Sequence, residues 1–451
     1  MLVCKFGGTS VADAEAIRRL VAIVRGRLAR QPIVVVSALS GTTNDLLAIA
    51  EQARAGQLIV ALATVEALRT RHLAVVQALA FDAATAADLA ADVSALFDEL
   101  AHLAEALSVL AHATDRAIDA VASLGEQLSA PIVAAALRAG GVAAQSVDAR
   151  EVLITDATFG RAEPQPERIA EAARRVLSPL VREGTVPVLG GFVGGTVEGT
   201  VTTLGRGGSD YSASLIGAAL DAEAIEIWTD VDGMLTADPR VVPAARLIPE
   251  IRFDEASELA TFGAKVLHPN TIAPAVRKAI PVLVLNSRRA AGAGTRITFD
   301  APRHAVRALA GKTNVTLVRV SSPRMLATPG ALAAIFAVFA EHGISVDVVA
   351  TAEVSVSVTI DDDRHLDRAA AALRRLGDVS IERGRGIVAV VGAGLGESTE
   401  AVAQAIRALG PIRAQMLSLA ASGINLTIVM DGTSVPDAMR RVHASFFEGA
   451  A

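Results

Sequence analysis

The sequence predicts an α/β protein: a three-layer αβα domain around a mostly parallel sheet, followed by two smaller modules of sheet and helix. Before Gly292, strand-like runs alternate with helical patterns, as in βαβ units. The runs are continuously apolar, which is typical of parallel strands covered by helices on both faces. After Gly292, shorter elements follow in the order β-α-β-β-α-β, a ferredoxin-like pattern that then begins again. The strand-like runs of the large domain are Ile33–Val36, Val186–Val193, Ala224–Trp228 and Pro281–Leu285.

The first element is a short strand, Leu2–Cys4, which runs directly into Lys5 and the pair Gly7 and Gly8. Apolar residues recur at helical spacing from Ile17 onward, which predicts an amphipathic helix after this turn. Glycines let backbone N–H groups approach an anion, and the start of a helix adds a positive dipole. The segment therefore predicts a polyphosphate-binding turn, although a structural Gly-Gly turn beside a solvated lysine has the same pattern.

Two later segments place polar residues where strands end. Ser37–Asn44 follows a strand and offers hydroxyls and backbone donors to an anion or an amino acid, as an ordinary Asn/Gly turn also would. Trp228–Gly233 ends another strand, and a turn-rich loop with Asp238–Arg240 comes soon after.

Two further segments are expected to begin helices. Leu124–Ser129 would open a helix, where Glu126 would be no more than a favourable charge at the positive end. Leu204–Asp210 combines three glycines with Arg206, which can pair bidentately with a carboxylate or a phosphate. We interpret this segment as a second anion-binding turn, with a flexible hairpin tip as the alternative.

Between Leu58 and Ser123 the sequence is alanine-rich, with apolar residues at helical spacing. This pattern predicts a helical insertion without strands. It consists either of ordinary packing helices or of part of a lid or a dimer surface.

The two copies of the C-terminal pattern predict two modules. The first copy comprises Asn314–Ser322, Pro329–Glu341, Ser345–Ala350, Glu353–Ile360, His365–Leu376 and Val379–Arg383. The second comprises Ile387–Val391, Glu397–Leu409, Ile412–Ala420, Ile424–Met430 and Val435–Phe447. Because the second copy ends before its last strand, we expect residues 303–311, with the strand-like run Ala305–Ala310, to complete it.

Composition excludes several classes of protein. The formal net charge of −6, without a basic block, argues against nucleic acid binding. A single cysteine, Cys4, excludes an internal disulfide and a cysteine-based metal cluster. The expected location is the cytoplasm, because the sequence has neither a membrane-spanning run nor a signal peptide. P-loop, zincin and serine-hydrolase motifs are also absent, and Gly392–Gly396 reads as a tight turn rather than an NAD site.

Four segments, in this order, resemble aspartate kinase (aspartokinase): Lys5–Ala12, Gly205–Asp210, Trp228–Gly233 and Phe262–Pro269. The resemblance covers essentially the whole chain. It implies an amino-acid-kinase-type catalytic domain over residues 1–295 and two ACT domains over 313–385 and 386–451. The effector-binding segments of the ACT pair would be Gly343–Asp347 and Glu353–Ser357. The length, without a fused dehydrogenase, is similar to that of the monofunctional, lysine-inhibited branch.

The resemblance implies transfer of the ATP γ-phosphoryl group to the β-carboxylate of L-aspartate. The product, 4-phospho-L-aspartate, begins lysine, threonine and methionine biosynthesis. A carboxylate with a pKa near ~3.9 is already ionised at pH 7, so the nucleophile needs positioning rather than a general base. The remaining requirements are charge neutralisation and in-line geometry. By similarity, Lys5 bridges the transferring group beside the amides of Gly7 and Gly8, and Asp210 organises Lys5 and the nucleotide.

Substrate and nucleotide residues are also implied by the resemblance. Arg206 would bind the α-carboxylate of aspartate and Glu126 the α-ammonium, with hydrogen bonds from Ser37, Thr43 and Ser209. Mg²⁺ is expected mainly on the ATP phosphates, without a metal site of the protein itself. The nucleotide would contact Lys5, Gly8, Thr229, Asp230, Leu235, Arg240, Lys265 and Val266, with Leu235 where the family usually has an aromatic residue.

The resemblance further implies feedback inhibition through the ACT domains, by lysine or alternatively by threonine, in a homodimer or a tetramer. Asp347 would suit the ammonium group of the effector, and the helix start at Gly330 its carboxylate. The expected effector residues are Met325, Thr328, Gly330, Ala331, Leu332, Ser345, Val346, Asp347, Thr351 and Glu353.

Three alternatives stay open at this point. The chain could be another kinase of the same superfamily, acting on glutamate, acetylglutamate or a nucleoside monophosphate. It could be a catalytically inactive sensor that uses its ACT pair to bind an amino acid and a partner. It could also be the aspartokinase part of a larger fusion protein.

Overall fold

The computed structural model describes residues 1–205, 207–263, 269–325 and 328–448. The chain forms two compact units, which we call the first unit and the second unit. The first unit contains Met1–Met234 and Leu267–Phe299, and the second contains Leu235–Val266 and Asp300–Ala451. A segment from the middle of the chain therefore belongs to the second unit.

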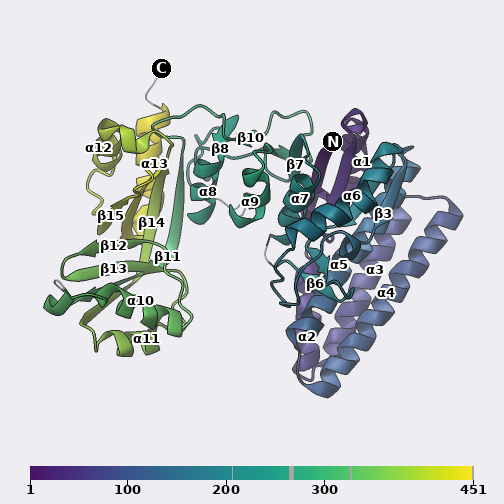
Figure 1. The fold of residues 1–451 in the computed structure, drawn as a ribbon, viewed down its shortest axis with the longest axis horizontal. Helices are drawn as coiled ribbons and strands as arrows, with labels where there is room; N and C mark the ends of the chain where they lie inside the picture. Colours follow the sequence, from purple (N-terminus) through teal and green to yellow (C-terminus); the bar gives the residue numbers. More distant parts are fainter. Residues whose placement is uncertain (206, 264–268, 326–327, 449–451) are drawn as a thin grey trace. The chain divides into compact units, whose positions relative to one another are not determined.

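The first unit is built of both strands and helices (Figure 1). Its strands are β1 (Leu2–Phe6), β2 (Pro32–Val36), β3 (Ala144–Val147), β4 (Val186–Gly190), β5 (Val193–Gly195), β6 (Val201–Thr203), β7 (Ala224–Thr229), β9 (Val282–Asn286) and β10 (Thr295–Thr298). Its helices are α1 (Ala14–Arg25), α2 (Thr42–Arg54), α3 (Leu58–Ala78), α4 (Ala83–Leu110), α5 (Asp115–Ala139), α6 (Pro166–Arg182), α7 (Gly208–Ala219) and α9 (Pro269–Arg277). The expected run Val186–Val193 divides into β4 and β5, because Phe192 has a φ of +65°.

Strand β1 lies inside a mostly parallel sheet with the order β3-β4-β2-β1-β7-β9-β10. Neighbouring strands are parallel except β9 and β10. Successive side chains of a strand point to opposite faces. Leu2, Cys4 and Phe6 join the core that α1 and α5 complete, whereas Lys5 lies on the face that α7 covers. The predicted three-layer αβα fold is thus confirmed.

The insertion Leu58–Ser123 is helical, as predicted: α3 and α4 pack against each other and against α2 and α5. Contrary to expectation, Leu124–Ser129 does not open a helix. Helix α5 begins at Asp115, because the Thr114 hydroxyl caps it by accepting from the N–H of Ala117, and Glu126 lies in mid-helix. By length and composition α5 is apolar enough to span a membrane, but 83% of its most apolar window is buried in the protein.

The second unit contains strands β8 (Glu250–Arg252), β11 (Ala308–Ser321), β12 (Val349–Ala352), β13 (Ser355–Ile360), β14 (Asp378–Val391), β15 (Met416–Leu419) and β16 (Asn425–Asp431). Its helices are α8 (Phe253–Thr261), α10 (Ala331–Glu341), α11 (Leu366–Leu373), α12 (Thr399–Ala408) and α13 (Val435–His443). Strands β12-β13-β11-β14-β16-β15 form one antiparallel sheet. Helices α10 and α11 complete a core on one half of this sheet, and α12 and α13 complete a core on the other.

Two long strands belong to both modules of this sheet. The two expected runs Ala305–Ala310 and Asn314–Ser322 are joined in one strand, β11, which begins at Ala308 and ends at Ser321. Strand β14 likewise joins Val379–Arg383 to Ile387–Val391. The early part of β11 pairs with the second module and its later part with the first, and register shifts separate the two parts. The modules therefore share one continuous sheet.

The expected strand Ser345–Ala350 is wrong in its first half, because β12 begins only at Val349. The N–H of Val348 binds the side-chain hydroxyl of Thr359 at 3.0 Å instead of a backbone carbonyl. The N–H of Asp347 and the carbonyl oxygen of Val348 still bond to the backbone of Thr359, so the pairing is irregular here and β12 begins only after it.

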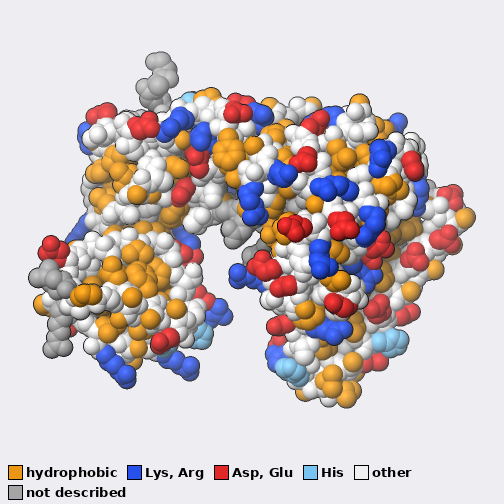
Figure 2. Space-filling model, in the orientation of Figure 1, with side chains coloured by type: hydrophobic (Ala, Val, Ile, Leu, Met, Phe, Trp, Pro, Cys, Tyr) orange, Lys and Arg blue, Asp and Glu red, His pale blue; other side chains and the backbone are white. Residues whose placement is uncertain are grey.

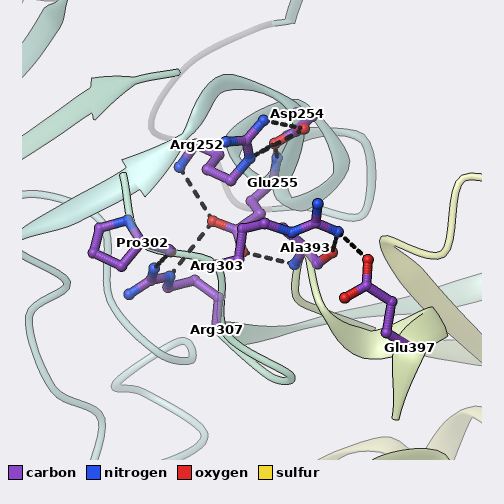
Figure 3. Close-up of polar contacts among 8 residues, drawn as sticks. All are labelled: Arg252, Asp254, Glu255, Pro302, Arg303, Arg307, Ala393 and Glu397. Carbon is purple, nitrogen blue, oxygen red and sulfur yellow. Dashed lines mark hydrogen bonds and ion pairs between the residues drawn. The ribbon is translucent and has the colours of Figure 1, made fainter. Parts of the chain in front are cut away.

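Helix α8 is held in the second unit by the fully buried carboxylate of Glu255 (Figure 3). Its Oε1 accepts from the N–H of Ala393 at 2.8 Å and its Oε2 from the N–H of Arg252 at 3.1 Å. The Nε of Arg307 lies 3.4 Å from the same Oε2. A buried carboxylate needs such partners, so this cluster explains why the segment around α8 packs with the C-terminal modules.

Candidate active site

Lys5 lies near the carboxyl end of β1, in the middle of the sheet. Its Nζ is 2.6 Å from Oδ1 of Asp210, and its side chain is 10% exposed. A Cβ built on Gly7 would lie 3.6 Å from this Nζ, so the glycine leaves room beside the ammonium group. The N–H of Gly7 itself donates to the carbonyl oxygen of Trp228 at 3.0 Å. The N–H of Gly7 is therefore already engaged and is not the free backbone donor that we expected, and Gly8 follows it at the start of a short 3₁₀ turn.

Helix α7 presents its first turn to the same edge of the sheet. Gly207, with a φ of +76°, precedes the helix, and Ser209 and Asp210 lie in its first turn. The hydroxyls of Ser37 and Ser209 are 2.9 Å apart. A Cβ on Gly191 would lie 2.5 Å from that of Ser209, so glycine is required where the chain after β4 meets α7. This packing joins three sheet-edge segments.

Glu126 projects from the middle of α5 and is 3% exposed. Its Oε1 accepts from the N–H of Ala38 at 3.1 Å. Its Oε2 is buried and has no hydrogen-bond partner among the residues that the structure describes. Burial raises the pKa of Glu126 from 4.5 to about 8, although the Ala38 N–H and the positive charge of Lys5 both act to lower it. A buried carboxylate with one open oxygen is suited to a cationic ligand group.

The loop that begins at Ser37 is fixed at both ends. Ser37 and Ala38 hold it to α7 and α5 as described, and the Nη2 of Arg71 donates to the carbonyl oxygen of Ser40 at 2.6 Å. Thr43 is half-buried in the first turn of α2. The sequence analysis missed Arg71. This arginine lies on helix α3 and binds Ser40, 31 residues earlier in the chain, and no sequence motif marks such a contact.

The expected nucleotide residues divide between the two units. Thr229 ends β7 in the first unit and Asp230 follows it, with Oγ1 of Thr229 donating to Oδ1 of Asp230 at 3.3 Å. In the second unit, Leu235 is half-buried, and Arg240 is exposed and paired with Asp238. The expected site residues Arg206, Lys265 and Val266 lie outside the described residues.

The expected effector residues all belong to the second unit. Met325 and Val346 pack against one core, Gly330 precedes α10 with a φ of +84°, and Thr328 is exposed nearby. Asp347 lies in the loop before β12, with Nζ of Lys312 at 3.3 Å from its carboxylate. The remaining residues are Ala331 and Leu332 at the start of α10, Ser345 in the loop, Thr351 in β12 and Glu353 after it.

Asp347 is electrostatically unusual. Burial and a hydrogen bond with Asp361 raise its pKa to about 6, while Lys312 acts to lower it. The ammonium of Lys312 also contacts Asp361, so one cation lies between two carboxyl groups. Sequence reasoning found Asp347 but missed Lys312 and Asp361, which come from the neighbouring strand β11 and the end of β13.

Within the described residues, no group of three or more histidine, cysteine, aspartate or glutamate side chains is arranged to hold a metal ion. Asp210 is the acidic side chain beside Lys5, and its ion pair with that lysine already uses one of its oxygens. This donor set would suit a metal ion held mainly by the phosphates, with Asp210 as a residue that could contact it.

Comparison with known proteins identifies the family. The amino acid kinase family model matches residues 1–286, and an ACT domain model matches residues 318–376. The chain is 39% identical to the lysine-sensitive aspartokinase 3 of Escherichia coli over 99% of both sequences. It is 36% identical to the chloroplastic aspartokinase 1 of Arabidopsis thaliana, over 99% of this chain and 80% of that one.

Solved structures agree with this result. E. coli aspartokinase III in complex with aspartate and ADP (R-state) matches with a TM-score of 0.86 and 38% identity, over 99% of this chain and 100% of that chain. The same enzyme in complex with lysine and aspartate (T-state) matches with a TM-score of 0.83 and 38% identity, over 99% of both chains. With both domain types matched and a relative aligned from end to end, the chain belongs to the aspartokinase family.

Proposed function

We propose that this aspartate kinase uses Lys5 and Asp210 to transfer the γ-phosphoryl group of ATP to the β-carboxylate of L-aspartate, and that L-lysine inhibits it through the ACT domains. The observation that carries the proposal is the connected set of contacts at the sheet edge. The Lys5–Asp210 ion pair is joined, through the Ser37–Ser209 and Ala38–Glu126 hydrogen bonds, to a buried carboxylate with an open oxygen.

The substrate is recognised at both ends. Glu126 accepts the α-ammonium group on its open Oε2, and Arg206 pairs with the α-carboxylate. Ser37, Thr43 and Ser209 add hydrogen bonds from the loop and from the start of α7. The β-carboxylate is then left facing the phosphoryl group. The E. coli relative solved with aspartate and ADP supports this choice of substrate.

The phosphoryl group is transferred by positioning and charge neutralisation. The ammonium of Lys5 lies at the sheet edge beside Gly7, so it can neutralise charge that develops on the γ-phosphate oxygens. Asp210 holds this ammonium in place through the 2.6 Å ion pair. Mg²⁺, held mainly by the ATP phosphates, supplies further neutralisation there. The carboxylate nucleophile needs no base, because it is ionised at neutral pH.

The nucleoside part of ATP is assigned to the end of β7 in the first unit. Thr229 ends β7 and Asp230 follows it, next to the lysine-bearing strand β1, and we assign the ribose to these two residues. The proposed nucleotide-binding residues also include Leu235, Arg240, Lys265 and Val266. Arg240 is 80% exposed, so its guanidinium is accessible to a polyphosphate despite its pairing with Asp238.

L-Lysine is the proposed effector, because the E. coli relative named lysine-sensitive aligns over the full chain and a T-state structure holds lysine. Asp347 receives an ammonium group of the ligand. Lys312 shows that an ammonium is accommodated at this carboxylate. The turn at Gly330, before α10, receives the ligand carboxylate.

Substitution Asp347→Asn is expected to raise the lysine concentration for half-inhibition at least about tenfold, because a charge-assisted hydrogen bond is lost. The uninhibited rate should not change. Inhibition curves at pH 7.5 would measure the effect, with Asp367→Asn, an 87% exposed carboxylate of the same module, as the control. Equal inhibition of Asp347→Asn and the parent would remove Asp347 from the effector site.

The second unit also supports a homodimer or a tetramer assembled through the ACT domains. Apolar side chains are exposed on the first module, including Leu332 (45%), Val349 (38%) and Val354 (43%), and Figure 2 shows the apolar surface over this region. A second copy of the chain would cover this surface. We place the enzyme in the cytoplasm, where a single buried cysteine, Cys4, remains reduced.

The first test is ADP release with Mg-ATP and L-aspartate, measured without effector, with L-lysine and with L-threonine. Aspartate-dependent turnover that lysine suppresses is the expected result. Suppression by threonine alone would replace the proposed effector. Turnover with another acid but not with aspartate would overturn the proposed substrate, and the absence of turnover with any acid would favour an amino-acid sensor.

A further inference from the structure

A second buried carboxylate, Asp119, lies on α5 about two helical turns before Glu126 and therefore on the same face of the helix. Asp119 is 1% exposed. Its Oδ2 accepts from the N–H of Gly160 at 2.9 Å and from the N–H of Thr203 at 3.1 Å. Its Oδ1 accepts from the hydroxyl of Thr203 at 2.6 Å. One carboxylate thus joins three separate segments of the first unit.

These contacts hold the segment from which the chain enters the 205–208 turn. Thr203 is the last residue of β6 and stands three positions before Arg206. The carbonyl oxygen of Thr203 accepts from the N–H of Ala162 at 2.9 Å, so both the N–H and the C=O of Thr203 are hydrogen-bonded. The Gly160 carbonyl packs against Gly205, where a Cβ would lie 3.6 Å from it.

We propose that Asp119 is a positioning residue for aspartate recognition, which fixes the base of the turn that carries Arg206. Helix α5 then serves both ends of the substrate: Glu126 binds the α-ammonium, and Asp119 fixes Gly160 and Thr203, next to the segment whose Arg206 we assign to the α-carboxylate. Neither Asp119 nor Thr203 touches the substrate. The inference rests on the proposed role of Arg206 in the substrate clamp.

The hydrogen-bond pattern predicts how three substitutions differ. Asp119→Ala removes every bond to Gly160 and Thr203. Thr203→Val removes the hydroxyl bond alone and leaves Oδ1 unpaired. Asp119→Asn can keep the pattern, because its oxygen can accept from both N–H groups while its amide donates to the hydroxyl of Thr203, which can also accept.

We therefore expect Asp119→Ala to raise the KM for aspartate about tenfold or more, with Thr203→Val intermediate and Asp119→Asn within about threefold of the parent. The KM for ATP should change less than about twofold in each case, because the ATP-binding groups are untouched. Asp115→Ala, an exposed carboxylate at the start of the same helix, is the matched control. Equal changes in both KM values, or a parental aspartate KM for Asp119→Ala and Thr203→Val, would overturn the proposal.

A double-mutant cycle with Arg206→Ala separates positioning from a general structural effect. If Asp119 acts through Arg206, adding Asp119→Ala or Thr203→Val to Arg206→Ala should change the aspartate KM by less than about twofold. Multiplicative effects would overturn the inference while leaving the substrate clamp intact. An unchanged KM in Arg206→Ala alone would instead refute the clamp, and the inference with it. Where Asp119→Ala does not fold, Thr203→Val completes the cycle.

Discussion

Replacement of Lys5 by methionine is expected to lower kcat at least about a hundredfold, because the group that neutralises the transferring phosphoryl charge is lost. Methionine keeps much of the volume of the side chain, so β1 should still pack. The loss should appear in kcat rather than in the aspartate KM, since the charge develops in the transition state. Steady-state ADP release at saturating ATP and aspartate measures it.

Two controls make this result specific. Lys278→Met removes a half-exposed lysine that pairs with Asp221 on the surface, and it should leave kcat unchanged. Lysine binding to Lys5→Met, followed by calorimetry, should be close to parental, because the proposed effector residues belong to the second unit. A Lys5→Met enzyme with near-parental kcat would show that another cation performs the neutralisation.

The sequence was sufficient to predict the fold class, because buried parallel strands leave continuous apolar runs and the repeated β-α-β-β-α-β order marks the modules. Boundaries that depend on local geometry were harder to predict. The break at Phe192 depends on a left-handed residue, and the late start of β12 depends on a side-chain bond from Thr359. The packing of residues 235–263 with the C-terminal modules depends on Glu255, which binds the distant Ala393.

The residues of the candidate site, too, could be predicted from the sequence only in part. The glycine-rich turns pointed to Lys5 and to Asp210, which the structure places 2.6 Å apart. Glu126 was found by resemblance, since its sequence neighbourhood suggested only a helix start. Asp119 and Arg71 carry no local signal, because their importance lies in which backbone groups fold against them. Sequence patterns identify residues that contact ligands more readily than residues that hold a loop in place.

The substitution Glu126→Gln should raise the KM for aspartate at least about thirtyfold, because a buried charge that pairs with the substrate ammonium is removed. Glutamine keeps the volume and an oxygen that can accept from the N–H of Ala38. The KM for ATP should stay within about twofold of the parental value, because no ATP group is expected at Glu126. Glu105→Gln, an exposed carboxylate on α4, is the control.

The pH dependence tests the same carboxylate in a second way. With a pKa of about 8, Glu126 is mostly protonated in the free enzyme at neutral pH, whereas binding of an ammonium group requires the ionised form. The parental kcat/KM for aspartate should therefore rise up to about tenfold per pH unit below pH 8 and then level off, and the Glu126→Gln profile should lack this rise.

As the pH rises, the stability of the ligand-free protein should fall, whereas aspartate binding should strengthen. A carboxyl whose pKa is raised on folding stabilises the protein below its unfolded pKa, near 4.5, and this contribution is lost as the pH rises through about 8. Thermal unfolding of the ligand-free parent should thus lose stability relative to Glu126→Gln between these pH values, and added aspartate should restore it. If both the stability difference and kcat/KM were independent of pH, Glu126 would already be ionised in the free enzyme. A cation of the protein would then occupy the place that we assign to the substrate ammonium.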